Sequence, residues 1–390
     1  MRLDSLKVVA ATTDISALVQ GMTLYESING FVKGNIQILD GINFFDNVIG
    51  GNDQLIGSSY IDHLALHPIE ITYFLGKVEC KNHFMMDGVN QMKINKSDKE
   101  YVIHLISAVE HSLKLTKINH VYEGPSHKIV QGIFEESTGF DSKLVINTIA
   151  TTKGKYIVPN ISAGAAISNV IGAAVDADHA GFYLYQRLSD WGATRLASIK
   201  TMAKDFFKNN DGDDFQISNN LPDQSQLNNA NYIPGGTSNN FTMTQYKMHH
   251  TNKLADGQYG NKIHHVRLDE TKIKKNEPVE QSRQEITTYK ISDKLYDTSK
   301  SLFRSIDDPS DLAAVNQKKR IHNTALSVSN MSPIPYIGCG NAVRVKQGGS
   351  TISHTISDGP YIISNINHVF QTEDNGINYI QNMSLIREYA

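Results

Sequence analysis

Apolar and polar residues alternate with a period of two through much of the chain, and this pattern limits the fold more than any other feature. In 35–46, Ile36 and Ile38 share one face, with polar residues between them. The segments 69–80 and 100–109 show the same period and are rich in β-branched and aromatic residues, which is typical of half-buried strands. Several short strands separated by glycine turns predict an antiparallel barrel or sandwich in this region.

The middle of the chain has a different pattern, with apolar residues at helical spacing. We predict one helix over 126–136 with Ser126 as its N-cap, and a second over 162–175 with Ser162 as its N-cap. A strand follows at 181–188. The alternation of helices and strands predicts a mixed α/β region.

The strand at 181–188 carries aromatic residues on both faces. Phe182 faces one side with Leu184, and Tyr183 and Tyr185 face the other. Exposed aromatic rings can stack on bases or sugars. We interpret these rings instead as core residues of a sheet, together with the pair Phe44–Phe45 and Trp191.

The second half of the chain begins with a polar break. Residues 208–240 contain nine asparagines and bury little apolar surface, so we expect a long loop or linker. Alternating segments then return, and 310–326 is predicted to be helical, with Ser310 as its N-cap. Two long alternating strands end the chain, and the sequence TEDNG between them predicts a hairpin.

The predicted fold class is mainly β with an α/β insert. We expect two antiparallel β-barrel modules joined by a mixed α/β connecting domain. The expected boundaries are a first barrel at 1–115, the connecting domain at 116–207, the asparagine-rich linker at 208–240, and a second barrel at 241–390 with a charged and helical excursion near 272–325.

Length and composition exclude several classes of protein. The 390 residues are too many for one ordinary core and suggest two to four domains. A net charge of −3 argues against a protein that coats nucleic acid through strong positive charge. The most apolar stretch, 161–175, is too short and too rich in small residues to span a bilayer. We expect no membrane-spanning segment and a protein made in a reducing cytoplasm.

The two cysteines, Cys80 and Cys339, lie far apart in the sequence. They cannot form a CxxC metal knuckle or a disulfide-dense secreted scaffold. One long-range disulfide is conceivable. Two buried free thiols are the interpretation that we favour.

A search for chemistry yields no catalytic, cofactor or metal site. The phosphate-binding, dinucleotide-binding and nucleophile-elbow motifs are absent. His63 and His67 lack an HExxH context. An EF-hand loop that began at Asn209 would need glycine at its sixth place and glutamate at its twelfth, where this chain has Asp214 and Asn220. The adjacent pairs His249–His250 and His264–His265 lie in strand-like segments, where neighbouring side chains point to opposite faces.

Two groups of charged residues have a functional interpretation beside a simpler one. Glu135, Glu136 and Asp141 could act as glycosidase carboxylates, but a solvated helix end explains them better. Three lysines could bind a phosphate, but glutamates bracket them, and we interpret them as a charged surface: Lys272, Lys274 and Lys275. We therefore expect no enzyme, no cofactor and no metal.

The order of several segments resembles the baseplate hub subunit of contractile-tailed (myovirus-type) bacteriophages. The segment 15–41 is similar to the start of these hubs, and 180–202 to their central hairpin, although WGATRL departs from the aromatic expected after the glycine. The segment 256–272 is similar to a later part of the hub. The matching positions in the first segment are Tyr25, Glu26, Gly34, Ile36, Ile38 and Asp40. The hub portion of type VI secretion (VgrG) spike proteins is a related assembly.

This resemblance implies a homotrimeric ring in the virion, assembled in the host cytoplasm. Two similar barrels per subunit would adapt a sixfold tail tube to a threefold central spike of OB and β-helix type. DNA would pass through the lumen without specific binding, which suits the near-neutral charge. The implied partners are the spike and tail tube or tube-initiator proteins, with baseplate wedge proteins as further candidates.

Two other functions stay open at this point. One is a tail-associated enzyme that acts on peptidoglycan, for which Glu135 and Glu136 would be the residues to mutate. The other is the hub of a different contractile injection machine, which gene neighbours would distinguish from a phage. The sequence shows neither an OB module nor a repetitive β-helix, so we expect a separate hub subunit of a phage.

Overall fold

The computed structural model describes the chain in several stretches. They are 2–3, 5–41, 65–75, 78–94, 99–138, 142–178, 180–190, 192–205, 216–218, 237–238, 242–248, 261–267, 274–275, 286–292, 324–331, 333–334, 336–346, 359–373 and 376–387. The sequence predictions for Phe44–Phe45, His63, Asp141 and Trp191 fall outside these stretches. So do 209–214, the pair His249–His250 and Lys272.

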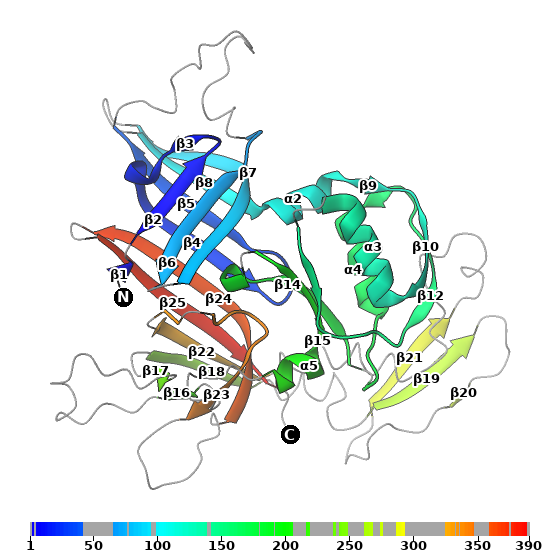
Figure 1. Ribbon diagram of the computed structural model, residues 1–390. Coiled ribbons are helices and arrows are strands. Elements are labelled where there is room, and N and C mark those ends of the chain that lie inside the picture. Colours follow the sequence, from blue (N-terminus) through cyan, green and yellow to red (C-terminus); the bar gives the residue numbers. More distant parts are fainter. Residues whose placement is uncertain are drawn as a thin grey trace, which may run out of the picture.

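The N-terminal strands form a first antiparallel barrel, drawn in blue and cyan in Figure 1. The pairing order is β24–β4–β5–β8–β7–β6–β2–β3, and each pair is antiparallel. The alternating patterns of the sequence therefore lie in strands as predicted. The strands are β1 (Arg2–Leu3), β2 (Leu6–Ala10), β3 (Thr13–Asp14), β4 (Val19–Ser27), β5 (Lys33–Asp40), β6 (Ile69–Leu75), β7 (Val78–Ile94) and β8 (Lys99–Ser107), with the short helix η1 (Ser16–Leu18) between β3 and β4.

One long hairpin belongs to both β regions. It consists of β24 (Gly359–Glu373) and β25 (Gly376–Ile386), which pair along their length as predicted. The C-terminal half of β24 pairs with β4, while its N-terminal end pairs with β23 (Ala342–Lys346). On its other edge, β25 pairs with β1 near its start and with β22 (Thr324–Met331) near its end. Because β1 continues into β2, the N-terminal segment joins the two ends of the strand order and closes the first barrel.

One strand of the C-terminal β region departs from the antiparallel prediction. Here β16 (Gln216–Ser218) runs parallel to both β17 (Thr237–Ser238) and β23, whereas β18 (Thr242–Met248) pairs antiparallel with β22. Parallel neighbours need a long crossover connection, and the sequence distance from β16 to β23 provides one. Period-two alternation does not distinguish the two directions, which is why the parallel pairing of β16 was not predicted, whereas β22, β23, β24 and β25 pair antiparallel as predicted.

The predicted excursion near 272–325 contains strands. A separate sheet joins β19 (Asn261–Arg267) antiparallel to β20 (Lys274–Lys275) and parallel to β21 (Ile286–Ser292). Most of the helix predicted at 310–326 lies outside the described residues. Its last three residues belong to β22, so the predicted end of that helix is wrong. The other domain boundaries stay a prediction.

The region between β8 and β16 is mixed α/β, as predicted, and lies beside the first barrel (Figure 1). Ser162 caps α4, since its Oγ accepts a hydrogen bond of 3.3 Å from the Ala165 amide. Ser126 is not a cap: it is the first residue of α3, and its hydroxyl donates to the Thr152 carbonyl. The elements are α2 (Ala108–Leu115), β9 (Lys117–Ile118), β10 (Val121–Pro125), α3 (Ser126–Thr138), β11 (Leu144–Ile146), β12 (Lys153–Ile157), β13 (Ile161–Ser162), α4 (Ala163–Ala173), β14 (Phe182–Gln186), η2 (Leu188–Asp190), β15 (Thr194–Ser198) and α5 (Ile199–Lys204).

Three hydrophobic cores organise these elements. The first fills the N-terminal barrel, the second lies among the C-terminal strands with β14, β15 and α5, and the third lies among α2, α3 and α4. The strand β14 separates two of them, because Phe182 packs into the third core while Tyr183 and Tyr185 pack into the second. The tyrosines are therefore core residues, as the sequence predicted.

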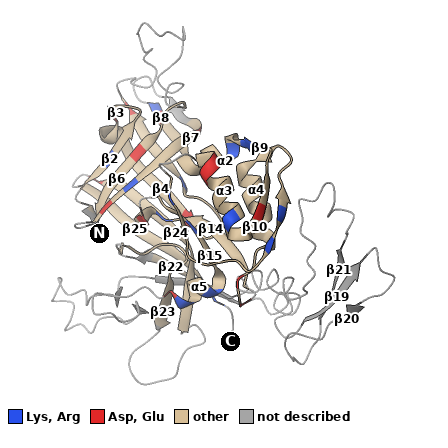
Figure 2. Ribbon diagram, turned by 45° about the vertical axis from the view of Figure 1, so that its right-hand side comes forward, with Lys and Arg blue, Asp and Glu red and all other residues tan. Residues whose placement is uncertain are grey.

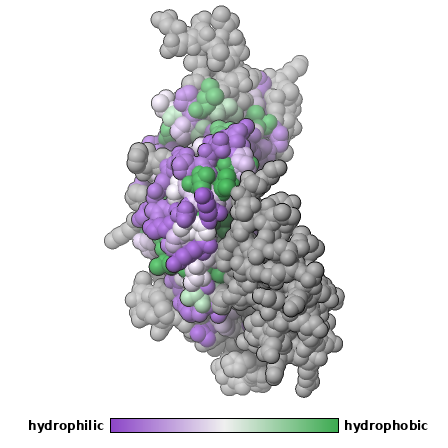
Figure 3. Space-filling view, turned by 90° about the vertical axis from the view of Figure 1, so that its right-hand side faces the viewer, coloured by the Kyte–Doolittle hydropathy of each residue, from purple (hydrophilic) through white to green (hydrophobic). Residues whose placement is uncertain are grey.

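The described surface carries mixed charge and scattered apolar residues. In Figure 2, basic and acidic residues are interspersed on α2 and α3. In Figure 3, polar residues cover much of the described part of one face, and apolar residues form small separate groups. Within the described residues, no helix is both long and apolar enough to cross a membrane.

Candidate functional site

The candidate carboxylates of the sequence do not form a catalytic pair. Glu135 accepts a hydrogen bond of 2.7 Å from Gln131 one turn earlier on α3, and Glu136 accepts one of 2.5 Å from the Tyr122 hydroxyl. Both glutamates are exposed on the last turns of the helix. Burial and this hydrogen bond raise the pKa of Tyr122. The arrangement fastens α3 to the ribbon of β10 and β12, which fits the solvated helix end favoured above.

The remaining candidates show no ligand cluster. His264 and His265 lie in β19, as the strand prediction required, and pair in register with Lys275 and Lys274 of β20. His67 is partly buried at the end of a turn before β6. Within the described part of the chain, no group of three or more histidine, cysteine or acidic side chains could hold a metal ion.

Both cysteines are free and buried, as predicted. Burial raises the pKa of the Cys80 thiol to about 11, and burial next to Glu26 raises that of Cys339 well above its usual value. Because the thiolate is the reactive form, we expect neither cysteine to react with a water-soluble disulfide reagent at pH 8 in the native protein. Both should react after unfolding in urea. Rapid labelling without denaturant would contradict this assignment.

The feature that sequence reasoning missed is a buried carboxylate between the first and the second core. Glu26 lies near the end of β4 and is fully buried. Its Oε1 accepts a hydrogen bond of 2.8 Å from the Leu188 amide, and its Oε2 accepts one of 3.0 Å from the Cys339 amide. Leu188 belongs to η2 and Cys339 to the loop before β23. One side chain therefore joins the first barrel, the connecting region and the C-terminal strands.

A histidine from the shared hairpin lies beside this carboxylate. The Nε2 of His368, on β24, lies 3.3 Å from Glu26 Oε1, an ion-pair distance at an angle outside that of a hydrogen bond. Its Nδ1 lies 2.6 Å from the Tyr379 hydroxyl on β25, which also accepts a hydrogen bond from Gln381. The Tyr379 ring stacks on Phe370 with centroids 4.3 Å apart. The polar chain is thus embedded in the aromatic core of the first barrel.

A buried arginine holds the same loop from the other side. Arg187, just after β14, donates from Nε to the Cys339 carbonyl at 2.7 Å and lies over the Tyr185 ring. Gly340 has a φ of +80°, and a Cβ there would lie 2.5 Å from the Tyr185 hydroxyl oxygen. The loop can pack this closely only because glycine occupies that position. We call the set Glu26, Arg187, Cys339, Gly340 and His368 the junction.

The electrostatics of the junction favour an ionised Glu26. Burial alone would raise the pKa of this carboxyl. The contact with His368 and the two backbone amides outweigh burial, so the pKa lies below its usual value of 4.5. A charged side chain that is held by amides from two other parts of the chain has the geometry of a structural clamp.

This lowered pKa predicts how stability depends on pH. The contribution of Glu26 is fully present above pH 4.5 and is lost as the pH falls through the lower pKa of the folded state. We therefore expect the difference in urea midpoint between the wild type and Glu26→Gln to shrink between pH 5 and pH 3. Hydrogen bonds to Lys81 and Ser16 also lower the pKa values of Glu70 and Asp14. Both residues are present in the wild type and in the variant, so their contributions cancel in the difference. A difference that stays constant with pH would contradict an ionised Glu26.

The sequence contained a signal for this site. In β4, Met22, Leu24 and Glu26 alternate with outward residues, so the period of two places the carboxylate on the buried face. In β5, Asp40 follows Ile36 and Ile38 in the same way, and all three are fully buried. These acidic residues were among the positions that carried the resemblance. An acidic residue at an inward strand position is a candidate for a buried clamp.

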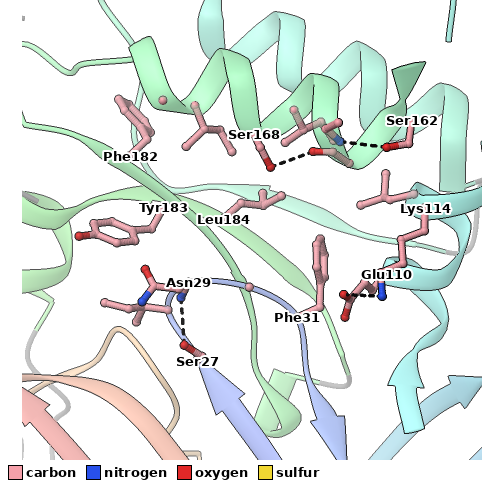
Figure 4. A pocket seen from close by; sticks show the side chains of 18 of the residues that line it. Ser27, Asn29, Phe31, Glu110, Lys114, Ser162, Ser168, Phe182, Tyr183 and Leu184 are labelled. Carbon is pink, nitrogen blue, oxygen red and sulfur yellow. Dashed lines mark hydrogen bonds and ion pairs between the residues drawn. The ribbon is translucent and has the colours of Figure 1, made fainter. Parts of the chain in front are cut away.

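A second candidate is a groove of about 880 Å³ between the β4–β5 turn and the α/β region. Phe31 and Leu184 line it, and one wall is α4 (Figure 4). At the α2 end, Glu110 Oε1 lies 3.2 Å from Lys33 Nζ and 3.1 Å from Lys114 Nζ. A mostly apolar groove with one ionic end can hold a chain segment or a small apolar molecule.

No protein-family model matches the sequence, and no curated protein sequence matches it. Solved structures do match. A tail protein from Neisseria meningitidis superposes with a TM-score of 0.57 at 8% identity, over 98% of this chain and 96% of that one. The 43 kDa tail protein of prophage MuSo2 from Shewanella oneidensis gives 0.56 at 10% identity, over 98% of both chains.

An E. coli component of the type VI secretion system also matches, with a TM-score of 0.51 at 9% identity, over 99% of this chain and 77% of that one. That protein is structurally similar to the T4 bacteriophage tail proteins gp27 and gp5. At these identities the likeness concerns the fold. The chain has the fold that these tail and type VI secretion proteins share.

Proposed function

We propose that this protein is a structural hub subunit of a contractile phage tail. The observation that carries the proposal is the match to two tail proteins over nearly the whole length of both partners. A likeness confined to one barrel would point only to a common module. Here the match extends across both β regions and the α/β region between them.

In this proposal the subunit forms a homotrimeric ring in the virion, assembled in the host cytoplasm. Two barrels per subunit present six similar units to the tail tube and three subunits to the central spike. Closed symmetry of this kind needs rigid subunits, because a barrel that rotates against its neighbour would break the ring geometry. The buried junction supports the proposal, since Glu26 fixes three parts of the chain to each other.

The proposed role requires no chemistry from the protein. DNA would pass through the lumen during genome ejection, and the net charge of −3 would limit binding to phosphates. The spike and the tube or tube-initiator proteins are the proposed partners, with baseplate wedge proteins as further candidates. Peptidoglycan hydrolysis finds no support, because Glu135 and Glu136 are engaged by Gln131 and Tyr122 on an exposed surface.

A second candidate function is the hub of another contractile injection machine. It is favoured by the likeness to the E. coli type VI secretion component. That chain is longer, since the match covers 77% of it. The genes beside this one distinguish the two proposals: tail and capsid genes would indicate a phage, and a secretion cluster would indicate the alternative.

The mass in solution tests the ring. Light scattering on a size-exclusion column should give about 130 kDa, three times the 43.3 kDa of one chain. A second measurement is made with the spike protein added, because binding to the spike can stabilise a trimer that does not form in its absence. A folded chain that stays monomeric in both measurements would contradict the hub proposal.

A further inference from the structure

The first barrel has two outer sides of different chemistry. On one side, which comprises β2, β6 and the start of β7, charged residues alternate with the inward core residues. Lys81 Nζ lies 2.8 Å from Glu70 Oε2, and Lys7 and His83 are exposed on the same side. This mixture of both signs is the surface that soluble proteins ordinarily carry.

The other outer side, formed by β25, β24, β4, β5 and β8, carries amides in place of charges. Two rows of outward residues cross these five strands in register, one through Asn35 and one through Gln37. Each row has one residue per strand, ten in all, and none is Lys, Arg, Asp or Glu. About three charged residues would be expected at ten surface positions. Six exposed or partly exposed residues on this side form what we call the amide face: Asn35, Gln37, Asn367, Gln371, Asn378 and Asn382.

A chain of hydrogen bonds orders one edge of this side. His104 Nδ1, on β8, lies 2.6 Å from Asn35 Oδ1, and its Nε2 lies 2.8 Å from Asn90 Nδ2 on β7. An amide oxygen accepts a hydrogen bond and an amide nitrogen donates one, so these contacts suit an uncharged imidazole ring. The histidine on this side is therefore held by neutral amides from the strands on both sides of it.

Two ordinary explanations of a neutral surface do not fit this one. Folding of the barrel does not require it, because β2, β6 and β7 of the same barrel carry charges on their outer side. The core of a protein interface is also poor in charge, but it is enriched in aromatic residues, methionine and arginine. The two rows contain no Phe, Tyr, Trp, Met or Arg. A polar, uncharged and solvent-accessible surface suits contact with a charged molecule that must not be held.

We propose that the amide face lines the lumen of the ring and is the wall along which duplex DNA passes. This inference rests on the proposed function. Every residue of such a wall occurs three times around the same DNA, so one lysine per subunit would add three phosphate contacts. One glutamate per subunit would add three charges that repel the phosphates. Amides can contact water and phosphate without a net charge, so they neither hold the DNA nor oppose its entry.

The test places lysines on the amide face and measures how DNA binding depends on salt. The variant Asn35→Lys/Gln37→Lys/Gln371→Lys adds three lysines per subunit and therefore nine per trimer. Each phosphate contact contributes about −0.9 to the slope of log K against log[NaCl], so nine lysines around one duplex should give a slope of about −8. The probe is a fluorescein-labelled duplex of about 16 base pairs, followed by fluorescence anisotropy between about 50 and 200 mM NaCl. The wild-type trimer should not bind it measurably.

A control variant adds the same charge outside the proposed lumen. Leu115→Lys/Val121→Lys/Ile149→Lys places three lysines at exposed positions of the α/β region. A duplex outside the ring would meet the lysines of one subunit, so the slope should be about −3 or smaller in magnitude. The difference between the two slopes reports whether lysines from three subunits converge on one DNA molecule.

The mass of each protein, from light scattering, separates the possible failures. If the amide-face variant is a trimer and its slope is no steeper than that of the control, the inference is wrong and the hub proposal stands. Tight binding of the duplex to the wild-type trimer would also overturn the inference. If the amide-face variant alone became monomeric, the face would be a contact between subunits and not a wall. A wild type that stays monomeric with its spike would contradict the ring itself.

Discussion

Replacing Glu26 with alanine should destabilise the protein far more than removing an exposed carboxylate would. Two buried amides, of Leu188 and Cys339, would lose their acceptor, and His368 would lose its ion-pair partner. Removing one member of a buried charged pair costs about 3–5 kcal/mol, because the groups left behind stay desolvated. We expect the free energy of unfolding to fall by about this amount.

The conservative variant separates charge from hydrogen bonding. Glu26→Gln keeps one oxygen acceptor but places an amide group beside a second buried N–H, so we expect an intermediate loss. Urea unfolding gives the free energies. The matched control is Glu135→Ala, which removes an exposed carboxylate from α3, and its free energy of unfolding should stay within about 0.5 kcal/mol of the wild-type value. Equal stability of Glu26→Ala and Glu135→Ala would show that the junction is not a clamp.

Amide hydrogen exchange adds a local test of the same variant. If Glu26 joins η2 and the loop before β23 to the first barrel, its loss should accelerate exchange at Leu188 and Cys339 before it affects the middle of β5 or β8. These two amides lie far apart in the sequence and donate to the same carboxylate. Faster exchange spread evenly over the whole chain would indicate a general loss of stability without a local joint.

Much of the local structure could be predicted from the sequence, because period and composition are local properties. The alternation in 35–46 and 69–80 predicted strands in β5 and β6, and Ser162 predicted the start of α4. The turn residues TEDNG predicted the final hairpin. In each case the signal lies within a few residues of the element that it specifies.

The predictions that failed concerned contacts between residues that are distant in the sequence. Alternation fixes which residues share a face but not which strand lies alongside, so the parallel pairing of β16 with β23 was missed. Nothing local shows that one hairpin pairs with strands of both β regions. Serine is a common N-cap residue, yet the Ser126 hydroxyl donates its hydrogen bond to the Thr152 carbonyl and caps no helix.

The candidate site was hidden for the same reason. Glu26 could be placed on the inward face of β4 from its neighbours alone. Its partners come from η2, the loop before β23 and β24, which only the folded chain brings together. The resemblance pointed to this position without giving its role, which is to hold modules that the sequence shows only as separate patterns.

Replacing Gly340 is the second substitution for which we expect a large loss of stability, and the cause is steric. Replacing it with alanine would place a side chain at a φ of +80°, which L-residues rarely adopt. The new Cβ would also lie 2.5 Å from the Tyr185 hydroxyl oxygen and 2.8 Å from its Cζ. The ring cannot easily retreat, because Tyr185 is buried in the second core and lies beneath Arg187.

We therefore expect Gly340→Ala to lower the free energy of unfolding by about 3–5 kcal/mol, since backbone strain and overpacking add at one position. Gly172→Ala is the matched control, because the same methyl group there meets open space on α4. Tyr185→Phe removes the nearest atom of the clash, so the double variant Gly340→Ala/Tyr185→Phe should recover part of the loss. If the two changes were simply additive, the close packing of the loop on Tyr185 would not be the cause, and backbone strain alone would have to account for the effect.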